Sequence, residues 1–313
     1  MREDIITVSV VNFKPFWGNK ECNLNRMQGY VKAAARQGSE LILFPEMALT
    51  GYDNEKQISK REKMQTRLAE TIPGPSTERL ENLAREMYVH IIFGMPEVDL
   101  EDPHKIYNSA AICCPDGTIK SYRKIHLPLD ESDWASRGEQ EMVFDTKWGK
   151  IGLSICYDTY EFPELIRYAK GKGARLFLNC TACCKAACPE PMVQTLLESN
   201  VIRDTIFIAS ANLCGYDNYN YFLGGSSIIG PSNDLGGVYY IAGKSFFEEK
   251  ADEENMYTAT IDLTLAEQNT SLCMYRHNER TGTTDFRPEI YSRIYGELAE
   301  SEEWKKLTYE DEK

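Results

Sequence analysis

The chain has 313 residues, enough for one large domain or two ordinary ones, so length alone does not decide the number of domains. Its 48 acidic side chains outnumber the 35 basic ones, and the formal net charge of −13 repels nucleic-acid phosphates and anionic lipid headgroups. We therefore expect no nucleic-acid partner and no binding to a membrane surface.

The first apolar run, Ile5 to Phe13, follows a charged start and is rich in β-branched residues. It predicts a strand rather than a signal peptide, which would carry an apolar region followed by a cleavage site. No stretch approaches the roughly 20 apolar residues that span a bilayer. Ten cysteines without a secretory signal favour a reducing compartment over a disulfide framework. We expect a cytoplasmic protein.

Apolar runs and helical patterns continue along the chain and predict an α/β fold. No repeat or flexible linker divides the chain, so we expect a single domain over residues 1–296. Residues 297–313 are highly charged, which predicts a solvated tail. The alternative is an arm that reaches across to a partner chain. The expected strands are Ile5 to Phe13, Leu41 to Phe44, His90 to Gly94, Ser109 to Cys114, Thr118 to Arg123, Ile151 to Ile155, Leu176 to Asn179, Ile206 to Ala211, Ser226 to Ile229, Val238 to Ala242 and Tyr257 to Ile261; the expected helices are Asn23 to Gln37, Thr77 to Met87, Pro163 to Lys170 and Met192 to Asp204.

Cys156 ends one of these strands and is followed at once by Tyr157 and Asp158, so its thiol enters a turn. Most cysteines pack as small apolar side chains, and one cysteine among ten therefore says little about catalysis. Glu46 and Lys124 change this, because both also follow apolar runs. Side chains at strand ends meet at one edge of an α/β sheet, where ligand crevices form.

Together these three side chains supply the groups that an acyl-transfer reaction requires. A thiol needs a base or a nearby cation to become a nucleophile, and Glu46 can accept its proton and later activate water. Lys124 can stabilise both the thiolate and the oxyanion of a tetrahedral intermediate, with the backbone N–H after Cys156 as a second donor. A Cys–His pair is the alternative, and among four histidines His126 is its best candidate.

The cysteines Cys183, Cys184 and Cys188 raise the question of a zinc site. There is no second cysteine pair at zinc-finger spacing, and histidines are few. We expect no metal ion, and the acyl-transfer chemistry above needs no organic cofactor.

The order of the motifs resembles the nitrilase, or carbon-nitrogen hydrolase, superfamily. That resemblance implies a four-layer α-β-β-α sandwich, a homodimer or larger assembly, and a Glu-Lys-Cys triad made of Glu46 as general base, Lys124 as oxyanion stabiliser and Cys156 as nucleophile. The motifs that carry the resemblance are Phe44-Pro45-Glu46, Arg123-Lys124-Ile125-His126-Leu127, Cys156-Tyr157-Asp158 with Phe162-Pro163-Glu164, and, further along, Ser210-Ala211-Asn212, Ser226 to Pro231 and Asp285 to Tyr291.

The same resemblance implies a second active-site carboxylate at Glu131, which positions the lysine and the substrate; an exposed loop carboxylate is the alternative. The chain departs from the family in one place close to the nucleophile. The spacing from Cys156 to the Phe-Pro-Glu motif is one residue longer than usual. Residues just beyond strand ends are candidates to bind the substrate, with ordinary loop packing as the alternative for each: Tyr52, Tyr157, Thr181 and Ala182.

We therefore expect an enzyme that hydrolyses a non-peptide C–N bond in a small amide or N-carbamoyl compound. A thioester on Cys156 would form and release ammonia or an amine. Three alternatives stay open at this point: a nitrilase that attacks a nitrile carbon, an acyltransferase that passes the same thioester to another acceptor, and a binding module with an inert triad.

Overall fold

The computed structural model describes residues 2–232, 237–268, 274–275 and 277–309. The chain divides into two compact units, Met1–Asn269 and Thr270–Lys313. The domain boundary expected after residue 296 falls inside helix α8 (Pro288–Glu300), and α9 (Glu302–Tyr309) follows it. The part of the expected tail that the structure describes is therefore helical, and residues 310–313 lie outside the described part.

Two six-stranded mixed sheets form the centre of the first unit. The first sheet has the order β14-β1-β2-β3-β4-β5, in which β1, β2 and β3 are parallel and the other pairs are antiparallel. Its strands are β1 (Ile5–Asn12), β2 (Leu41–Leu43), β3 (His90–Val98), β4 (Ile106–Cys113), β5 (Ile119–Arg123) and β14 (Asn255–Asp262).

The second sheet has the order β13-β12-β9-β8-β7-β6, and β7, β8 and β9 are its parallel strands. A small hairpin of β10 (Cys214–Tyr216) and β11 (Tyr221–Leu223) lies outside both sheets. The connection between β12 and β13 lies partly outside the described residues. The strands of the second sheet are β6 (Met142–Thr146), β7 (Gly149–Ile155), β8 (Leu176–Thr181), β9 (Phe207–Asn212), β12 (Ser227–Pro231) and β13 (Val238–Gly243).

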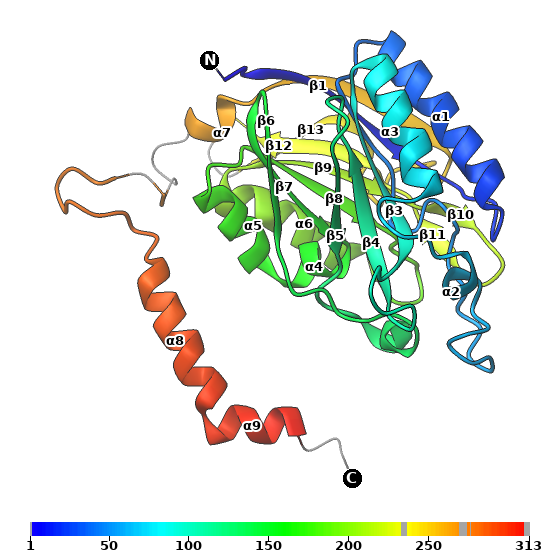
Figure 1. Ribbon diagram of the computed structural model, residues 1–313. Coiled ribbons are helices and arrows are strands. Elements are labelled where there is room, and N and C mark those ends of the chain that lie inside the picture. Colours follow the sequence, from blue (N-terminus) through cyan, green and yellow to red (C-terminus); the bar gives the residue numbers. More distant parts are fainter. Residues whose placement is uncertain (1, 233–236, 269–273, 276, 310–313) are drawn as a thin grey trace. The chain divides into compact units, whose positions relative to one another are not determined.

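Helices cover the outer faces of both sheets. Figure 1 shows α1 (Lys20–Arg36) and α3 (Pro75–Met87) side by side over the first sheet, and α5 (Pro163–Gly171) with α6 (Glu190–Asp204) over the second. The unit is thus the four-layer α-β-β-α sandwich that the family resemblance implied. Three short helices complete the unit together with a 3-10 helix at Leu129–Asp133: α2 (Met64–Leu68), α4 (Tyr157–Glu161) and α7 (Leu265–Gln268).

Alternating side chains divide the core into layers, because successive residues of a strand face opposite sides of a sheet. Leu41 and Leu43 of β2 belong to the apolar core between the two sheets, whereas Ile42 between them packs with residues of α1 and α3. All three are fully buried, and burial of each such side chain contributes about 1.5–3 kcal/mol. The two sheets are therefore packed against each other through one continuous core, which fixes how their strand ends lie.

The strands and helices expected from the sequence are all present, with shifts of a few residues at their ends. Two elements next to the nucleophile were missed. The edge strand β6 is half-buried and its apolar run is only three residues long, and α4 has five residues, too few for a helical period to show. Among the described residues, no helix combines the length and the apolar character needed to cross a membrane.

Candidate active site

The three predicted side chains stand at strand ends. Lys124 directly follows β5 and Cys156 directly follows β7, while Glu46 comes three residues after the end of β2. The segment that carries Glu46 runs close against β3 at Gly94, whose N–H donates to the carbonyl of Pro45 at 2.9 Å. A Cβ at Gly94 would lie 2.5 Å from the Cα of Glu46, so only glycine allows this approach.

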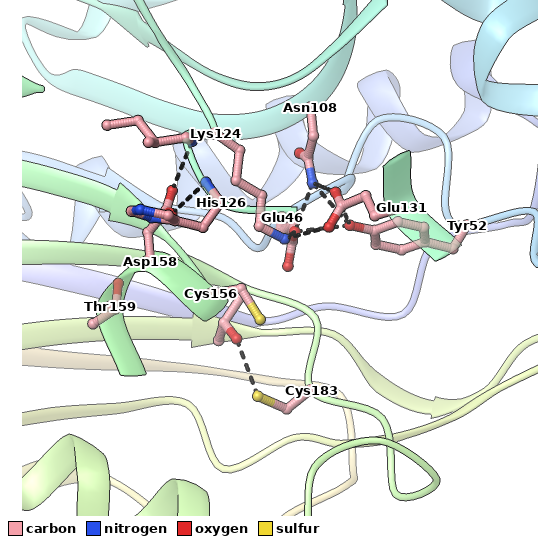
Figure 2. A network of polar contacts seen from close by, with 12 residues as sticks. Glu46, Tyr52, Asn108, Lys124, His126, Glu131, Cys156, Asp158, Thr159 and Cys183 are labelled. Atoms are coloured by element: carbon pink, nitrogen blue, oxygen red, sulfur yellow. Dashed lines mark hydrogen bonds and ion pairs between the residues drawn. The ribbon is translucent and has the colours of Figure 1, made fainter. Parts of the chain in front are cut away.

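Five side chains form one hydrogen-bonded network on the side of the first sheet (Figure 2). The ammonium of Lys124 donates to Glu46 Oε1 at 2.8 Å and to Glu131 Oε2 at 2.7 Å. The amide of Asn108 donates to Glu46 Oε1 at 2.7 Å and also to Glu131, and the hydroxyl of Tyr52 donates to Glu46 Oε1 at 2.7 Å. The three contacts on Glu46 all fall on Oε1, so Oε2 takes part in none of them.

Burial and charge together set the ionisation of this network. Burial by itself lowers the pKa of Lys124, but the carboxylates of Glu131 and Glu46 outweigh it and hold that pKa well above its ordinary value. Burial raises the pKa of Glu131, although Lys124 opposes the shift. Burial and the same two carboxylates raise the pKa of Tyr52 well above its ordinary value. Lys124 therefore stays cationic and Tyr52 stays a hydrogen-bond donor.

Cys156 occupies a strained turn between β7 and α4. Its φ of 49° and ψ of −105° are unusual for a residue with a side chain, and such strain persists only where the surroundings impose it. Its backbone N–H donates to the carbonyl of Cys180 at 2.9 Å and to Asn179 Oδ1 at 3.1 Å. The next amide, that of Tyr157, opens α4 and has no partner within the helix. The turn thus presents the thiol beside an N–H that can bind an oxyanion.

Asp158 joins the nucleophile turn to the lysine segment. Its Oδ2 accepts from the Tyr122 hydroxyl at 2.6 Å and from the backbone N–H of Ile125 at 3.2 Å. Its Oδ1 accepts from the backbone N–H of His126 at 2.9 Å and lies 2.8 Å from Nδ1 of that residue. The imidazole of His126 also stacks on Phe162, with ring centroids 3.4 Å apart. His126 therefore pairs with Asp158 and not with Cys156.

A cavity of about 460 Å³ opens where the two sheets meet at these strand ends. Its volume suits a small molecule. Glu46, Lys124, Glu131 and Cys156 all line it, so the structure brings the predicted residues around one space. In Figure 2 the charged network lies on one side and Cys156 on the other.

The four residues expected to bind the substrate divide in two groups. Tyr52, Tyr157 and Ala182 line the cavity. Thr181 does not lie on the cavity wall: it is fully buried at the end of β8, and its hydroxyl lies 3.3 Å from the sulfur of Cys183. The expectation for Thr181 is corrected, because the strand end turns its side chain behind the wall rather than into the cavity.

The neighbouring cysteines form a thiol-rich wall rather than a metal centre. Cys184 and Cys188 line the cavity, and Cys183 is fully buried next to them. Burial and contact with Cys156 and Cys188 raise the pKa of Cys183 well above its ordinary value, so its thiol stays neutral. Within the described ranges, no group of three or more histidine, cysteine, aspartate or glutamate side chains is arranged to hold a metal ion.

The sequence analysis did not identify three residues that belong to the site. Asn108 stands with Ser109 as a polar pair inside the buried strand β4, and that polar interruption was the one available sign of its role. Asp158 stands two residues after Cys156, but nothing in its spacing shows that it binds the lysine segment. Lys63 lines the cavity from the segment before α2, which has no periodic pattern.

Fold and site together define a hydrolase of the carbon-nitrogen type. The sequence model of the carbon-nitrogen hydrolase family matches residues 7–269, and the chain belongs to this family of enzymes. A probable nitrilase, C965.09 of Schizosaccharomyces pombe, is 31% identical over 291 residues, covering 92% of this chain and 97% of that protein. Omega-amidase NIT2 of Xenopus tropicalis is 32% identical over 256 residues, covering 78% and 84%. Among solved structures, Saccharomyces cerevisiae Nit3, a member of branch 10 of the nitrilase superfamily, has a TM-score of 0.72 at 25% identity and covers 85% of this chain and 93% of that one.

Proposed function

We propose that this enzyme hydrolyses the C–N bond of a small amide or N-carbamoyl compound through a thioester on Cys156. The observation that carries the proposal is the cavity wall, where a carboxylate, an ammonium and a thiol from three separate strand ends face one space. Two similar proteins are named omega-amidase and probable nitrilase, and both names fit carbon-nitrogen chemistry.

The first half-reaction uses all three groups. Glu46 takes the thiol proton, and the sulfur of Cys156 attacks the carbonyl carbon to give a tetrahedral intermediate. Lys124 and the N–H of Tyr157 bind its oxyanion, where buried charges and dipoles act strongly. The intermediate then expels the nitrogen, which receives the proton from Glu46 and leaves as ammonia or an amine.

The second half-reaction restores the enzyme. Glu46 accepts a proton from water, the resulting hydroxide attacks the thioester carbon, and the sulfur leaves as the carboxylic acid forms. The proton held by Glu46 returns to Cys156. Glu131 does not react; it shares the ammonium of Lys124 with Glu46 and so holds the lysine in place.

A nitrile is the second candidate substrate, because similar proteins of Schizosaccharomyces pombe and Pyrococcus abyssi carry the names probable nitrilase and nitrilase. The same sulfur would then attack a nitrile carbon to give a thioimidate. A panel of amides, N-carbamoyl compounds and nitriles, with ammonia measured, separates the two. We expect turnover of amides or N-carbamoyl compounds and its loss in Cys156→Ala; turnover that survives in that variant would overturn the mechanism.

We also propose a reducing, cytoplasmic location and self-association. Nine cysteines in the described part of the chain are free, as expected of a protein in a reducing compartment. Self-association is supported by α8, where Tyr291, Ile294, Tyr295 and Leu298 are exposed at helical spacing. Light scattering coupled to size-exclusion chromatography tests it, with a mass of one chain as the contrary result.

A further inference from the structure

Four thiols gather where β7 and β8 end. Cys183 is fully buried, and its side chain contacts those of Cys156 and Cys188. Cys184 and Cys188 line the cavity, as Cys156 does. In Figure 2 Cys183 lies beside Cys156, on the side of the site opposite the charged network. The proposed reaction uses the thiol of Cys156 and leaves the other three thiols without a role.

Cys156 and Cys183 differ in their access to small molecules. Cys156 is 8% exposed on the cavity wall, whereas Cys183 is fully buried behind that wall. A small oxidant that enters the cavity therefore reaches the sulfur of Cys156 first. Burial raises the pKa of Cys183 well above its ordinary value, so its thiol stays protonated and unreactive until the neighbouring sulfur has changed.

Backbone hydrogen bonds hold these two cysteines in place. The N–H of Cys183 donates to Asn212 Oδ1 at 2.9 Å, and its carbonyl accepts from the N–H of Leu223 at 3.0 Å. The N–H of Cys156 donates to the carbonyl of Cys180 at 2.9 Å. Because both backbones are fixed in this way, the two side chains stay within reach of each other.

Cys188 is placed to assist a reaction of Cys183. Its backbone N–H donates to the carbonyl of Cys184 at 2.9 Å, in a turn that brings its side chain back to Cys183. A hydrogen bond with Cys183 lowers the pKa of Cys188. Cys188 can therefore accept the proton of Cys183 when the sulfur of Cys183 acts as a nucleophile.

We propose that Cys156 and Cys183 form a site of reversible oxidation by hydroperoxides, in which Cys183 captures oxidised Cys156 as a disulfide. This inference rests on the reactive thiol that the proposed function assigns to Cys156. Hydrogen peroxide transfers one oxygen atom to the sulfur of Cys156, which becomes a sulfenic acid, and water is released. The sulfur of Cys183 then attacks that of Cys156, the S–O bond breaks, and the hydroxyl leaves as a second water with the proton that Cys183 gives up.

The disulfide would have two consequences for the enzyme. It occupies the sulfur that attacks the substrate, so hydrolysis stops while the disulfide lasts. It also prevents further oxidation of Cys156 to a sulfinic acid, which thiol reductants do not reverse. Thiol–disulfide exchange with a reductant would restore both thiols and the activity.

Peptide mapping after mild oxidation tests the proposal. The full chain is treated with hydrogen peroxide in the absence of substrate, the remaining thiols are blocked with iodoacetamide, and the protein is digested without reductant. We expect a peptide pair that joins Cys156 to Cys183. Ammonia release from the best amide should fall as this pair forms and should return when dithiothreitol is added.

Cys183→Ala should be active before oxidation. After peroxide and dithiothreitol, at least about tenfold less activity should return than in wild type, because Cys156 then proceeds to the sulfinic acid. Cys183→Ser makes the same test with a side chain of similar size. Cys214→Ala is the matched control, because it removes another buried thiol, 1% exposed, that does not line the cavity, and it should recover as wild type does.

Three results would overturn the proposal: no Cys156–Cys183 peptide pair in the oxidised wild type, a disulfide from Cys156 to Cys184 or Cys188 in its place, or equal recovery in wild type and Cys183→Ala. If neither Cys183 variant folds, the peptide map of the wild type still decides. The map needs no turnover, so it also separates this proposal from the proposed function. If the disulfide forms but no amide is hydrolysed, the reaction is wrong and the thiol pair stands; if amides are hydrolysed but Cys156 is oxidised only to a sulfinic acid, the thiol pair is wrong and the reaction stands.

Discussion

The first sheet contributes charge to the cavity, whereas the second contributes a thiol on a strained turn. Glu46, Lys124 and Glu131 are each at most 9% exposed and are bound to one another by short hydrogen bonds. Cys156 is held instead by its backbone, and its close neighbour Cys183 is neutral. The proposed catalytic groups therefore converge only because the two sheets pack against each other.

The difference between the charged side and the thiol side of the cavity also affects stability. Burial of charges is unfavourable, and their mutual attraction repays it only when every partner is in place. The charged side should therefore be intolerant of single changes in both stability and activity. The thiol side should lose activity when Cys156 changes but otherwise tolerate substitution. The four changes that follow break or sharpen this contrast.

Lys124→Met should have the largest effect. It leaves Glu46 and Glu131 buried without a cation, so we expect a loss of about 3–5 kcal/mol in the free energy of unfolding together with loss of activity. Urea denaturation followed by circular dichroism measures the first. Arg79→Met is the control, because Arg79 forms an exposed pair with Glu21 and its loss should change stability by at most about 1 kcal/mol. Equal changes in the two variants would contradict the contrast.

Glu46→Gln should reduce kcat by about 10²- to 10⁴-fold, because it removes the proposed general base. Its effect on stability should be smaller than that of Lys124→Met, since the Lys124 and Glu131 pair remains. Glu131→Gln is the matched change at the other carboxylate that contacts Lys124, and it should retain more activity. Steady-state kinetics on the best amide compares them. The reverse order would make Glu131 the base.

Asp158→Asn tests the connection between the two sides. Asn cannot accept all the hydrogen bonds that Asp158 receives from Tyr122, Ile125 and His126. We expect a loss of about 1–3 kcal/mol in stability and a fall in kcat with little change in KM. Tyr122→Phe removes one of these bonds and should cost about 1 kcal/mol. A change confined to stability would show that Asp158 does not position Lys124 against Cys156.

Cys183→Ala should have the smallest effect. The thiol of Cys183 contacts Cys156 but takes no part in the proposed reaction, so kcat should stay within about threefold of wild type and stability should fall by about 1 kcal/mol. Kinetics and denaturation on one preparation give both values. A loss of activity comparable to that of Glu46→Gln would show that the thiol side is also a functional network.

The residues at strand ends could be predicted from the sequence, because an apolar run followed by a reactive side chain marks a strand end. Glu46 and Cys156 were selected in this way, Lys124 was selected as the residue after the second arm of a hairpin, and the family resemblance added Glu131; all four line the cavity. The strands of both sheets were also predictable, with the exception of the half-buried edge strand β6, whose apolar run has only three residues.

The remaining site residues depend on contacts between distant segments. Asn108 reaches Glu46 across 62 positions and Asp158 reaches Tyr122 across 36, and no local pattern encodes such pairs. Thr181 shows the opposite error: it stands at a strand end, but its side chain is turned away from the cavity. Position at a strand end thus selects candidates, and only the packing of the two sheets decides which side chains face the cavity.

Intact-mass analysis of the enzyme mixed rapidly with its best amide tests the central claim most directly. The acyl group should add to the wild-type chain, peptide mapping should place it on Cys156 among the ten cysteines, and Glu46→Gln should change the amount trapped. Cys156→Ala should carry no adduct. Ammonia released at the wild-type rate with no adduct, or an adduct on another residue, would contradict the account.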